Sequence, residues 1–204
     1  MTGGPATTAR CISPVGTLRT PREKWIEAGL TMLAAHGVDA VRIDVLAKSL
    51  GVTRGGFYGY FADRGALLTE MLSTWERECV DEVIRHVQDG QENVLDQVRL
   101  AGQLTFATDR LLAIDLAIRD WARRDEDVAE RLRRVDNRRM QLLREAISTF
   151  CPDPDEVEAR CLLAFCTAIG RHLLAADHPG RTRDEVVANA ADLILGRAPE
   201  DRSS

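Results

Sequence analysis

Apolar residues recur at helical spacing along most of the chain, beginning with a run over residues 25–33. Thr20 can cap this first helix, Pro21 fits its first position, and Glu23 can bond back to the cap residue, a combination known as a capping box. Gly37 suits the end of the run, because glycine readily adopts the left-handed conformation that often follows a helix. The sequence therefore predicts a first helix that starts at Pro21 and ends before Gly37.

Two short helical segments follow the first one. Residues 43–50 place their aliphatic side chains on one side, and Gly51 interrupts the pattern. Residues 54–61 form the second segment, with Thr53 as its expected cap and two inward-facing phenylalanines four residues apart. Two short helices joined by a tight glycine turn predict a helix-turn-helix, whose second helix enters the major groove of DNA.

The rest of the chain keeps the same helical spacing, and no stretch alternates between apolar and polar residues as a half-buried strand would. Asp63 and Asp153 are suited to cap two of these helices, and Pro179 with Gly180 separates the last two. Residues 1–18 lack periodicity and are expected to form a flexible tail. The sequence thus predicts an all-α fold whose later helices span roughly 63–89, 93–107, 110–123, 125–150, 154–177 and 182–196.

The composition is that of an ordinary globular protein, with 45% hydrophobic and 29% charged residues among 204. No run of about 18 apolar residues occurs, and the N-terminus lacks the apolar segment of a secretion signal, so a cytoplasmic protein with no membrane contact is expected. The five cysteines form no CxxC pair, which argues against a disulfide scaffold or a zinc site. Buried thiols are favoured, with a redox sensor as the alternative.

Charge divides the chain unevenly. Residues 1–64 hold eight basic and five acidic groups, a net charge of +3, whereas the remaining residues hold 19 basic and 27 acidic groups, a net charge of −8. A mildly basic N-terminal segment on an acidic body suits a segment that faces phosphate. The overall net charge of −5 is therefore compatible with DNA binding.

An aliphatic first helix that ends in glycine is followed by the motif residues Leu46-Ala47, Gly51-Val52-Thr53, Gly55-x-Phe57-Tyr58-x-x-Phe61 and Arg64. With these residues, the segment from Trp25 to Leu72 resembles the DNA-binding domain of the TetR family of bacterial transcriptional regulators. The resemblance implies an all-α protein with two parts. The first is an N-terminal three-helix helix-turn-helix DNA-binding domain over residues 19–65, and the second is a helical ligand-binding and dimerisation domain over residues 66–198.

The resemblance also implies roles for individual positions. Thr53, Arg54 and the glycines near them lie where family members read or closely approach bases, and the two tyrosines lie where side chains contact phosphates. Arg64, at the start of the next helix, matches a basic residue that binds phosphate, and Arg42 and Lys48 can add contacts to the DNA backbone. The predicted DNA-binding residues are Arg42, Lys48, Thr53, Arg54, Gly55, Gly56, Tyr58, Gly59, Tyr60 and Arg64.

Three positions depart from the residues that are usual in the family. Arg42 stands where a capping Thr or Ser is common, Gly56 where Thr or Ser is common, and Gly59 where His is common. Each glycine in a helix costs about 1 kcal/mol relative to alanine, so the recognition helix is expected to fray in the free protein and to become firm on DNA. Arg54 and contacts that sense DNA shape should then carry more of the recognition.

The last two predicted helices should hold two subunits together, as they usually do in the TetR family. The helix over residues 154–177 is apolar on a wide surface, and the helix over residues 182–196 carries one apolar stripe. A helix that is apolar on two sides needs two partners, so a homodimer is expected, with a core formed entirely within one subunit as the alternative. The predicted dimer interface comprises Phe165, Ile169, Leu173, Val187, Ala190 and Ile194.

The resemblance further implies a pocket for a small-molecule effector in the C-terminal body. The candidate lining residues are also typical of an ordinary core. The arginine-rich run from Arg119 to Arg144 could attract an anionic ligand, but the acidic residues between the arginines favour a solvated helix face with ion pairs. The candidate pocket residues are Trp75, Cys79, Phe106, Trp121, Phe150 and His172.

Taken together, these features predict a DNA-binding transcriptional regulator, a repressor by family default, that a small-molecule effector releases from a palindromic double-stranded DNA operator. Activation in place of repression stays open. An enzyme is disfavoured because the four histidines lack metal-ligand spacing and no nucleophile or phosphate-loop motif occurs, so no metal, cofactor or catalytic residue is expected. The alternative is a helical protein-interaction module that has lost DNA binding, which the unusual residues at positions 56 and 59 keep open.

Overall fold

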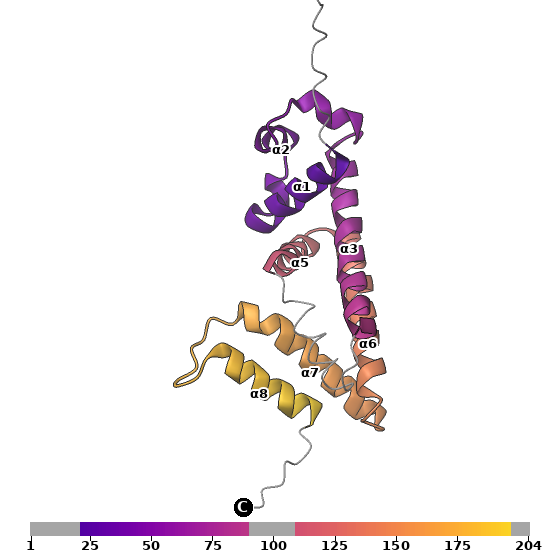
Figure 1. The fold of residues 1–204 in the computed structure, drawn as a ribbon, viewed down its shortest axis with the longest axis vertical. Helices are drawn as coiled ribbons and strands as arrows, with labels where there is room; N and C mark the ends of the chain where they lie inside the picture. Colours follow the sequence, from indigo (N-terminus) through magenta and orange to yellow (C-terminus); the bar gives the residue numbers. More distant parts are fainter. Residues whose placement is uncertain (1–20, 90–108, 197–204) are drawn as a thin grey trace, which may run out of the picture.

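The computed structural model describes residues 21–89 and 109–196, and within these ranges the chain is entirely helical (Figure 1). The predicted helix over 93–107 and the predicted tail over 1–18 lie outside the described residues. The all-α prediction is confirmed for the described part. Its elements are α1 (Arg22–His36), η1 (Val38–Ala40), α2 (Ile43–Ser49), η2 (Arg54–Gly59), α3 (Arg64–Asp89), α5 (Asp109–Ala122), α6 (Glu126–Ile147), α7 (Pro154–Leu173) and α8 (Arg183–Leu195).

Most helix ends follow the predicted capping signals. The Asp63 carboxylate accepts a hydrogen bond from the backbone N–H of Ala66 at 2.8 Å. Asp153 accepts one from the backbone N–H of Asp155 at 3.0 Å. These bonds satisfy N–H groups that a helix start leaves without an intrahelical partner. The prediction for Pro21 is wrong, because its extended backbone (φ −58°, ψ 149°) makes it the N-cap of α1 and not the first helical residue.

The second short segment is a six-residue 3-10 helix, η2, and not the α-helix that the sequence predicts over residues 54–61. Three of its six residues are glycine, which is a poor α-helix former, and 3-10 geometry is common in such short pieces. Thr53 has the expected extended backbone of a cap residue, but its side chain makes no capping hydrogen bond. The segment therefore relies on tertiary contacts to hold its position.

The helices form a head, a shaft and a base (Figure 1). The head consists of α1, α2 and η2. The long helix α3 begins in the head and runs beside α6 along the shaft, while α5 packs across α1 and α3. An antiparallel pair, α7 and α8, forms the base. The predicted boundary between residues 65 and 66 falls within the first turn of α3, so one continuous helix belongs to both parts of the protein.

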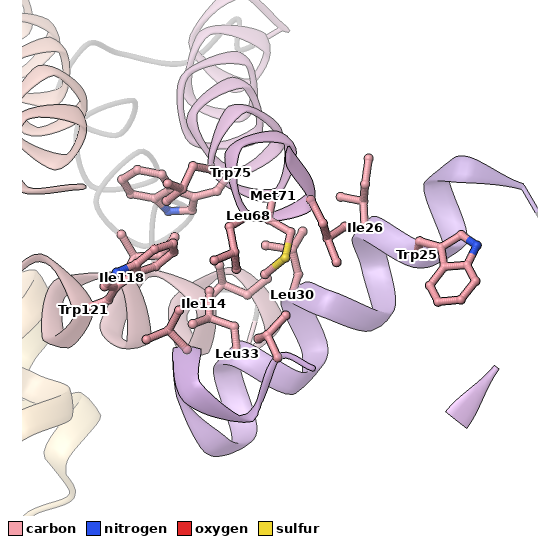
Figure 2. Packing of buried hydrophobic residues seen from close by; sticks show 14 of the residues in the cluster. Trp25, Ile26, Leu30, Leu33, Leu68, Met71, Trp75, Ile114, Ile118 and Trp121 are labelled. Atoms are coloured by element: carbon pink, nitrogen blue, oxygen red, sulfur yellow. The ribbon is translucent and has the colours of Figure 1, made fainter. Parts of the chain in front are cut away.

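The main hydrophobic core lies between α1, α3 and α5. Figure 2 shows side chains of all three helices pointing toward one another, among them Leu30, Leu33, Met71 and Ile114. Gly29 allows the close approach of α1 to α3, because a Cβ atom there would lie 2.6 Å from the sulfur of Met71. Burial of each such side chain stabilises the fold by about 1.5–3 kcal/mol. Because α1 belongs to the head, this shared core joins the head to the remaining helices, α3 and α5 to α8, which together are called the body.

A charged network is buried beside that core, where α3, α5 and α6 meet. The Asp115 side chain is only 1% exposed and Arg139 only 4%. Arg139 Nη1 donates to Asp115 Oδ1 at 3.0 Å, Trp75 Nε1 donates to the same oxygen at 3.3 Å, and Arg119 Nε donates to Oδ2 at 2.8 Å. Arg119 also donates two hydrogen bonds to Asp136, at 2.7 and 2.8 Å. The carboxylates of Asp115 and Asp136 thus neutralise the charges of the two guanidinium groups in this network.

The thiol of Cys79 closes one end of this network. Arg139 Nη2 lies 3.0 Å from the Cys79 sulfur, and Cys79 is 1% exposed. Burial raises the pKa of the Cys79 thiol to about 12, although the Arg139 charge acts in the opposite direction. The thiol therefore stays protonated at neutral and mildly alkaline pH, and the buried-thiol interpretation of the sequence fits Cys79.

We expect Cys79 to resist alkylation at pH 8 in the folded protein. The nucleophile is the thiolate, and both the raised pKa and the burial of Cys79 suppress its reaction. Mass spectrometry of the Cys79 peptide after iodoacetamide treatment, with and without denaturant, measures this protection. Equal rates of labelling in the folded and denatured protein would show that the site is open.

Candidate nucleic-acid interface

The turn between α2 and η2 contains Gly51, as the sequence predicts. Gly51 has φ +67°, a backbone conformation that side chains other than glycine rarely adopt. Leu46 and Ala47 of α2 are buried, so α2 is anchored in the core of the head. The reversal at Gly51 then places η2 against the same core.

Aromatic side chains fix η2 on the head. Phe57 is fully buried, and its ring meets that of Trp25 from α1 edge-on, with ring centres 5.4 Å apart. Phe61 stacks on Phe57 at 5.2 Å. Three rings from α1, η2 and the residues just after η2 therefore hold a short segment that contains three glycines. The prediction that the two phenylalanines face inward is confirmed.

The opposite side of the head presents most of the predicted DNA-binding residues to solvent. Arg54 donates a hydrogen bond to the Tyr58 hydroxyl at 3.1 Å, and its guanidinium lies over the Tyr58 ring. Gly56, Tyr60 and Arg64 are half-buried. The exposed members of the predicted set are Arg42, Lys48, Thr53, Arg54, Gly55, Tyr58 and Gly59. An exposed surface with three cations and a tyrosine suits contact with a polyanion.

Arg64 has an intramolecular role that the sequence did not indicate. Its Nε donates to the carbonyl oxygen of Val41 at 2.6 Å and its Nη2 to that of Val38 at 2.5 Å. These carbonyls belong to the connection between α1 and α2, so the first residue of α3 is hydrogen-bonded to that connection. Two of the three guanidinium nitrogens of Arg64 therefore form hydrogen bonds within the protein. Arg64 thus stabilises the folded head, a role that its predicted phosphate contact did not include.

Replacement of Arg64 with alanine should lower the free energy of unfolding by about 1.5–3 kcal/mol, because two charge-assisted hydrogen bonds are lost and two carbonyls are left without these donors. Arg42→Ala is the matched control, since Arg42 is exposed and its ion pair with Asp44 is exposed as well. Urea denaturation compares the two variants with the parent protein. A loss no larger for Arg64→Ala than for Arg42→Ala would refute the structural role.

An ion-pair cluster connects the head to the body at the start of α5. Arg110 Nε donates to Glu27 of α1 at 2.8 Å, and Arg110 Nη1 donates to Glu78 of α3 at 2.9 Å. The hydrogen bond from Arg110 lowers the pKa of Glu27, even though partial burial raises it. The contribution of this ion pair to stability is present at neutral pH and is lost as the pH falls through that lowered pKa.

The predicted effector-pocket residues do not form a single group in the structure. Trp75 and Cys79 belong to the buried network, and Trp121 is buried on α5 with its indole N–H donating to Asp125 at 3.1 Å. Phe150 packs in a second, separate cluster between α6 and α7. His172 lies half-buried on α7, and Phe106 lies outside the described residues. Trp75, Cys79 and Trp121 all pack in the main hydrophobic core, and the effector pocket stays a prediction.

The predicted dimer residues differ in their surroundings: some contact the same subunit and others line a groove between α7 and α8. Phe165 is half-buried with its ring under the Arg119 guanidinium of α5, 5.7 Å from the ring centre, so it contacts the body of its own subunit. Leu173, Val187 and Ala190 line a groove of about 470 Å³ between α7 and α8. Ile169 and Ile194 are half-buried. Leu173 of the predicted set is 67% exposed. The predicted set did not include four other exposed leucines on or just after these helices, namely Leu162, Leu163, Leu174 and Leu193.

Two other properties of the described residues bear on function. None of the helices in residues 21–89 and 109–196 combines the length and apolar character that a helix crossing a bilayer requires. In the same ranges, no three or more His, Cys, Asp or Glu side chains are grouped so that they could hold a metal ion.

The aromatic core under η2, the glycine turn and the exposed cations define the class of this protein: it is a DNA-binding helix-turn-helix protein. Residues 26–71 match the sequence model of bacterial regulatory proteins of the tetR family. The N-terminal part of the chain therefore carries the DNA-binding domain of the tetR type. The resemblance that the sequence suggested is thereby confirmed. No curated protein matches the chain.

Solved structures share the fold over nearly the whole chain. A transcriptional regulator from Rhodococcus sp. Rha1 superposes with a TM-score of 0.68 at 20% identity, over 87% of this chain and 95% of that one. A TetR-family transcriptional regulator from Bordetella parapertussis 12822 gives a TM-score of 0.62 at 17% identity, over 90% and 98%. The transcriptional regulator FadR from Bacillus subtilis, in complex with stearoyl-CoA, gives 0.63 at 12% identity, over 85% and 97%.

Proposed function

We propose that this regulator binds a palindromic operator in double-stranded DNA as a homodimer and represses transcription until a small-molecule effector releases it. In this proposal, residues 19–65 form the DNA-reading head and residues 66–198 form the part that binds effector and partner subunit. The observation that carries the proposal is the pairing of an exposed cationic helix-turn-helix with an uncovered apolar surface on the last two helices.

That apolar surface supports the dimer. Leu163 on α7 is 55% exposed and Leu193 on α8 is 83% exposed, and Leu162 and Leu173 are also exposed. Neighbouring exposed leucines on one pair of helices are unusual for a surface that stays in water. A second copy of the same two helices, related by a two-fold axis, would cover them. Two heads at a fixed separation would then read two half-sites.

The contacts between head and body support control by an effector. Because α1 shares its core with α5 and is joined to it by the Arg110–Glu27 ion pair, a shift of α5 would move the head. A ligand that binds the body better when the heads are apart would weaken DNA binding, and DNA would weaken ligand binding by the same factor. Stearoyl-CoA in the FadR complex shows that this fold admits a ligand in another protein.

Selection of duplexes from a random DNA pool by the full-length protein tests the proposal. The expected result is an inverted-repeat site, bound by two subunits, whose affinity falls steeply with salt as phosphate contacts require. Sedimentation of the complex gives the number of subunits. If no duplex is enriched at low salt, the protein is not a DNA-binding repressor, and the protein-interaction alternative takes its place.

A further inference from the structure

The exposed side of η2 carries an arginine and a tyrosine that are held together. Arg54 Nη2 donates to the Tyr58 hydroxyl at 3.1 Å, and the Arg54 guanidinium carbon lies 5.9 Å from the centre of the Tyr58 ring. The Tyr58 ring in turn meets the edge of Phe57 at 5.4 Å, and Phe57 is fully buried. The buried core therefore supports Tyr58, and Tyr58 supports Arg54, although both side chains reach into solvent.

This hydrogen bond leaves the edge of Arg54 that can read DNA available. A guanidinium has five N–H donors in a fixed planar fork, and Tyr58 takes one of them. Two parallel donors remain for the O6 and N7 acceptors of guanine, which is the commonest specific contact of arginine in the major groove. Holding a long side chain in place before binding reduces the rotamer entropy that is lost when the complex forms.

The two residues after Arg54 cannot share this task. Gly55 and Gly56 have no side chain, and neither has the positive φ that would require glycine. An added Cβ atom at Gly55 would meet nothing closer than Thr53 Oγ1 at 3.8 Å, and at Gly56 it would meet nothing within 4 Å. The fold thus leaves room for side chains here that the sequence does not supply. Base reading in η2 falls mainly on Arg54.

We propose that Tyr58 is a positioning residue that directs Arg54 toward one guanine in each half-site, so that base discrimination depends on the pair. This inference rests on the proposed DNA-binding function and adds to it the residue that sets specificity. It differs from the phosphate contact that the family resemblance implies for Tyr58. A phosphate contact strengthens binding to every sequence, whereas a positioning role strengthens binding only where the guanine is present.

The experiment uses the full-length protein and the best duplex from the random pool. Each base pair of a half-site is replaced in turn, and the ratio of dissociation constants gives the discrimination at that position. The variants are Arg54→Ala, Tyr58→Phe and the double variant, with Thr149→Val as a control that removes an exposed hydroxyl just after α6, outside the head. Tyr58→Phe keeps the ring against both Phe57 and Arg54, and thermal denaturation checks that each variant is folded.

Arg54→Ala should reduce discrimination at a single guanine by roughly 5- to 100-fold. Tyr58→Phe should reduce discrimination at the same guanine by at least about threefold, and the double variant should lose no more than Arg54→Ala alone, because Tyr58 acts through Arg54. Thr149→Val should leave discrimination there unchanged.

Three results would overturn the inference while the proposed function stands. Tyr58→Phe could weaken all duplexes by one common factor, it could leave every duplex unaffected, or its effect could multiply with that of Arg54→Ala in the double variant. Failure of the parent protein to bind any duplex at low salt would instead remove the proposed function itself.

Discussion

Replacement of Asp115 with alanine should lower the free energy of unfolding by about 3–5 kcal/mol, because Arg139 would keep a buried charge without its closest carboxylate. Trp75 and Arg119 would lose the same acceptor. For a protein of this size, such a loss corresponds to a fall in melting temperature of roughly 6–20 °C. Differential scanning calorimetry at one fixed protein concentration measures it, since the stability of a dimer depends on concentration.

Two further variants identify the cause of that loss. Asp136→Ala removes a carboxylate of the same network that is 25% exposed, so water can replace part of what is lost and the effect should be smaller. The double variant Asp115→Asn with Arg139→Met removes both buried charges and should recover most of the stability. If Asp115→Ala and Asp136→Ala are equally destabilised, burial of the ion pair is not the cause.

Replacement of both Leu163 and Leu193 with glutamate should convert the dimer into monomers at micromolar concentration. The two side chains lie on the exposed apolar surface, and each substitution occurs twice in a symmetric dimer. Burial of unpaired carboxylates at the contact should weaken the dimer by about 100-fold or more. Folding of the single subunit should change by less than about 0.5 kcal/mol per substitution, because both leucines are exposed in it.

Sedimentation velocity over a range of concentrations measures this change, with Asn137→Glu on the exposed surface of α6 as the matched control.

The exposed thiol of Cys166 on α7 gives a second measurement, since it should be labelled faster in the monomeric variant than in the parent dimer. Cys11 is replaced with serine so that its thiol does not contribute to the labelling signal. A double variant that sediments as the parent dimer would place the interface elsewhere. Retention of full operator affinity by the monomer would show that dimerisation is not needed for binding.

Local sequence signals predicted the elements of this protein well. The carboxylates of Asp63 and Asp153 begin helices because a short side chain can reach the free N–H groups of the next few residues. Gly51 adopts a positive φ because it lacks a Cβ atom. Phe57 lies inward, as its large apolar side chain predicts, although the segment is a 3-10 helix. Each of these outcomes depends on residues only a few positions apart.

The sequence could not reveal which distant side chains meet. Arg64 resembles a phosphate ligand by its position in the motif, yet it donates to carbonyls 23 and 26 residues earlier in the chain. Trp75 and Asp115 are 40 positions apart, and nothing local to either residue indicates a hydrogen bond between them. The first contact arises when α3 packs on the connection between α1 and α2, and the second when α3 packs against α5. They depend on the angles and separations between helices, which periodicity does not contain.

By itself the sequence indicated the helical elements, the helix-turn-helix and the tetR-type DNA-binding domain, because turns, caps and apolar spacing act over a few residues and leave a local pattern. The tertiary structure decided that Arg119 lies over Phe165, that Asp115 and Arg139 neutralise each other inside the body, and that Leu163 of α7 and Leu193 of α8 stay exposed in the single subunit. These outcomes depend on which face of each helix the other helices cover. That choice is made by the packing of the whole chain and not by any one segment.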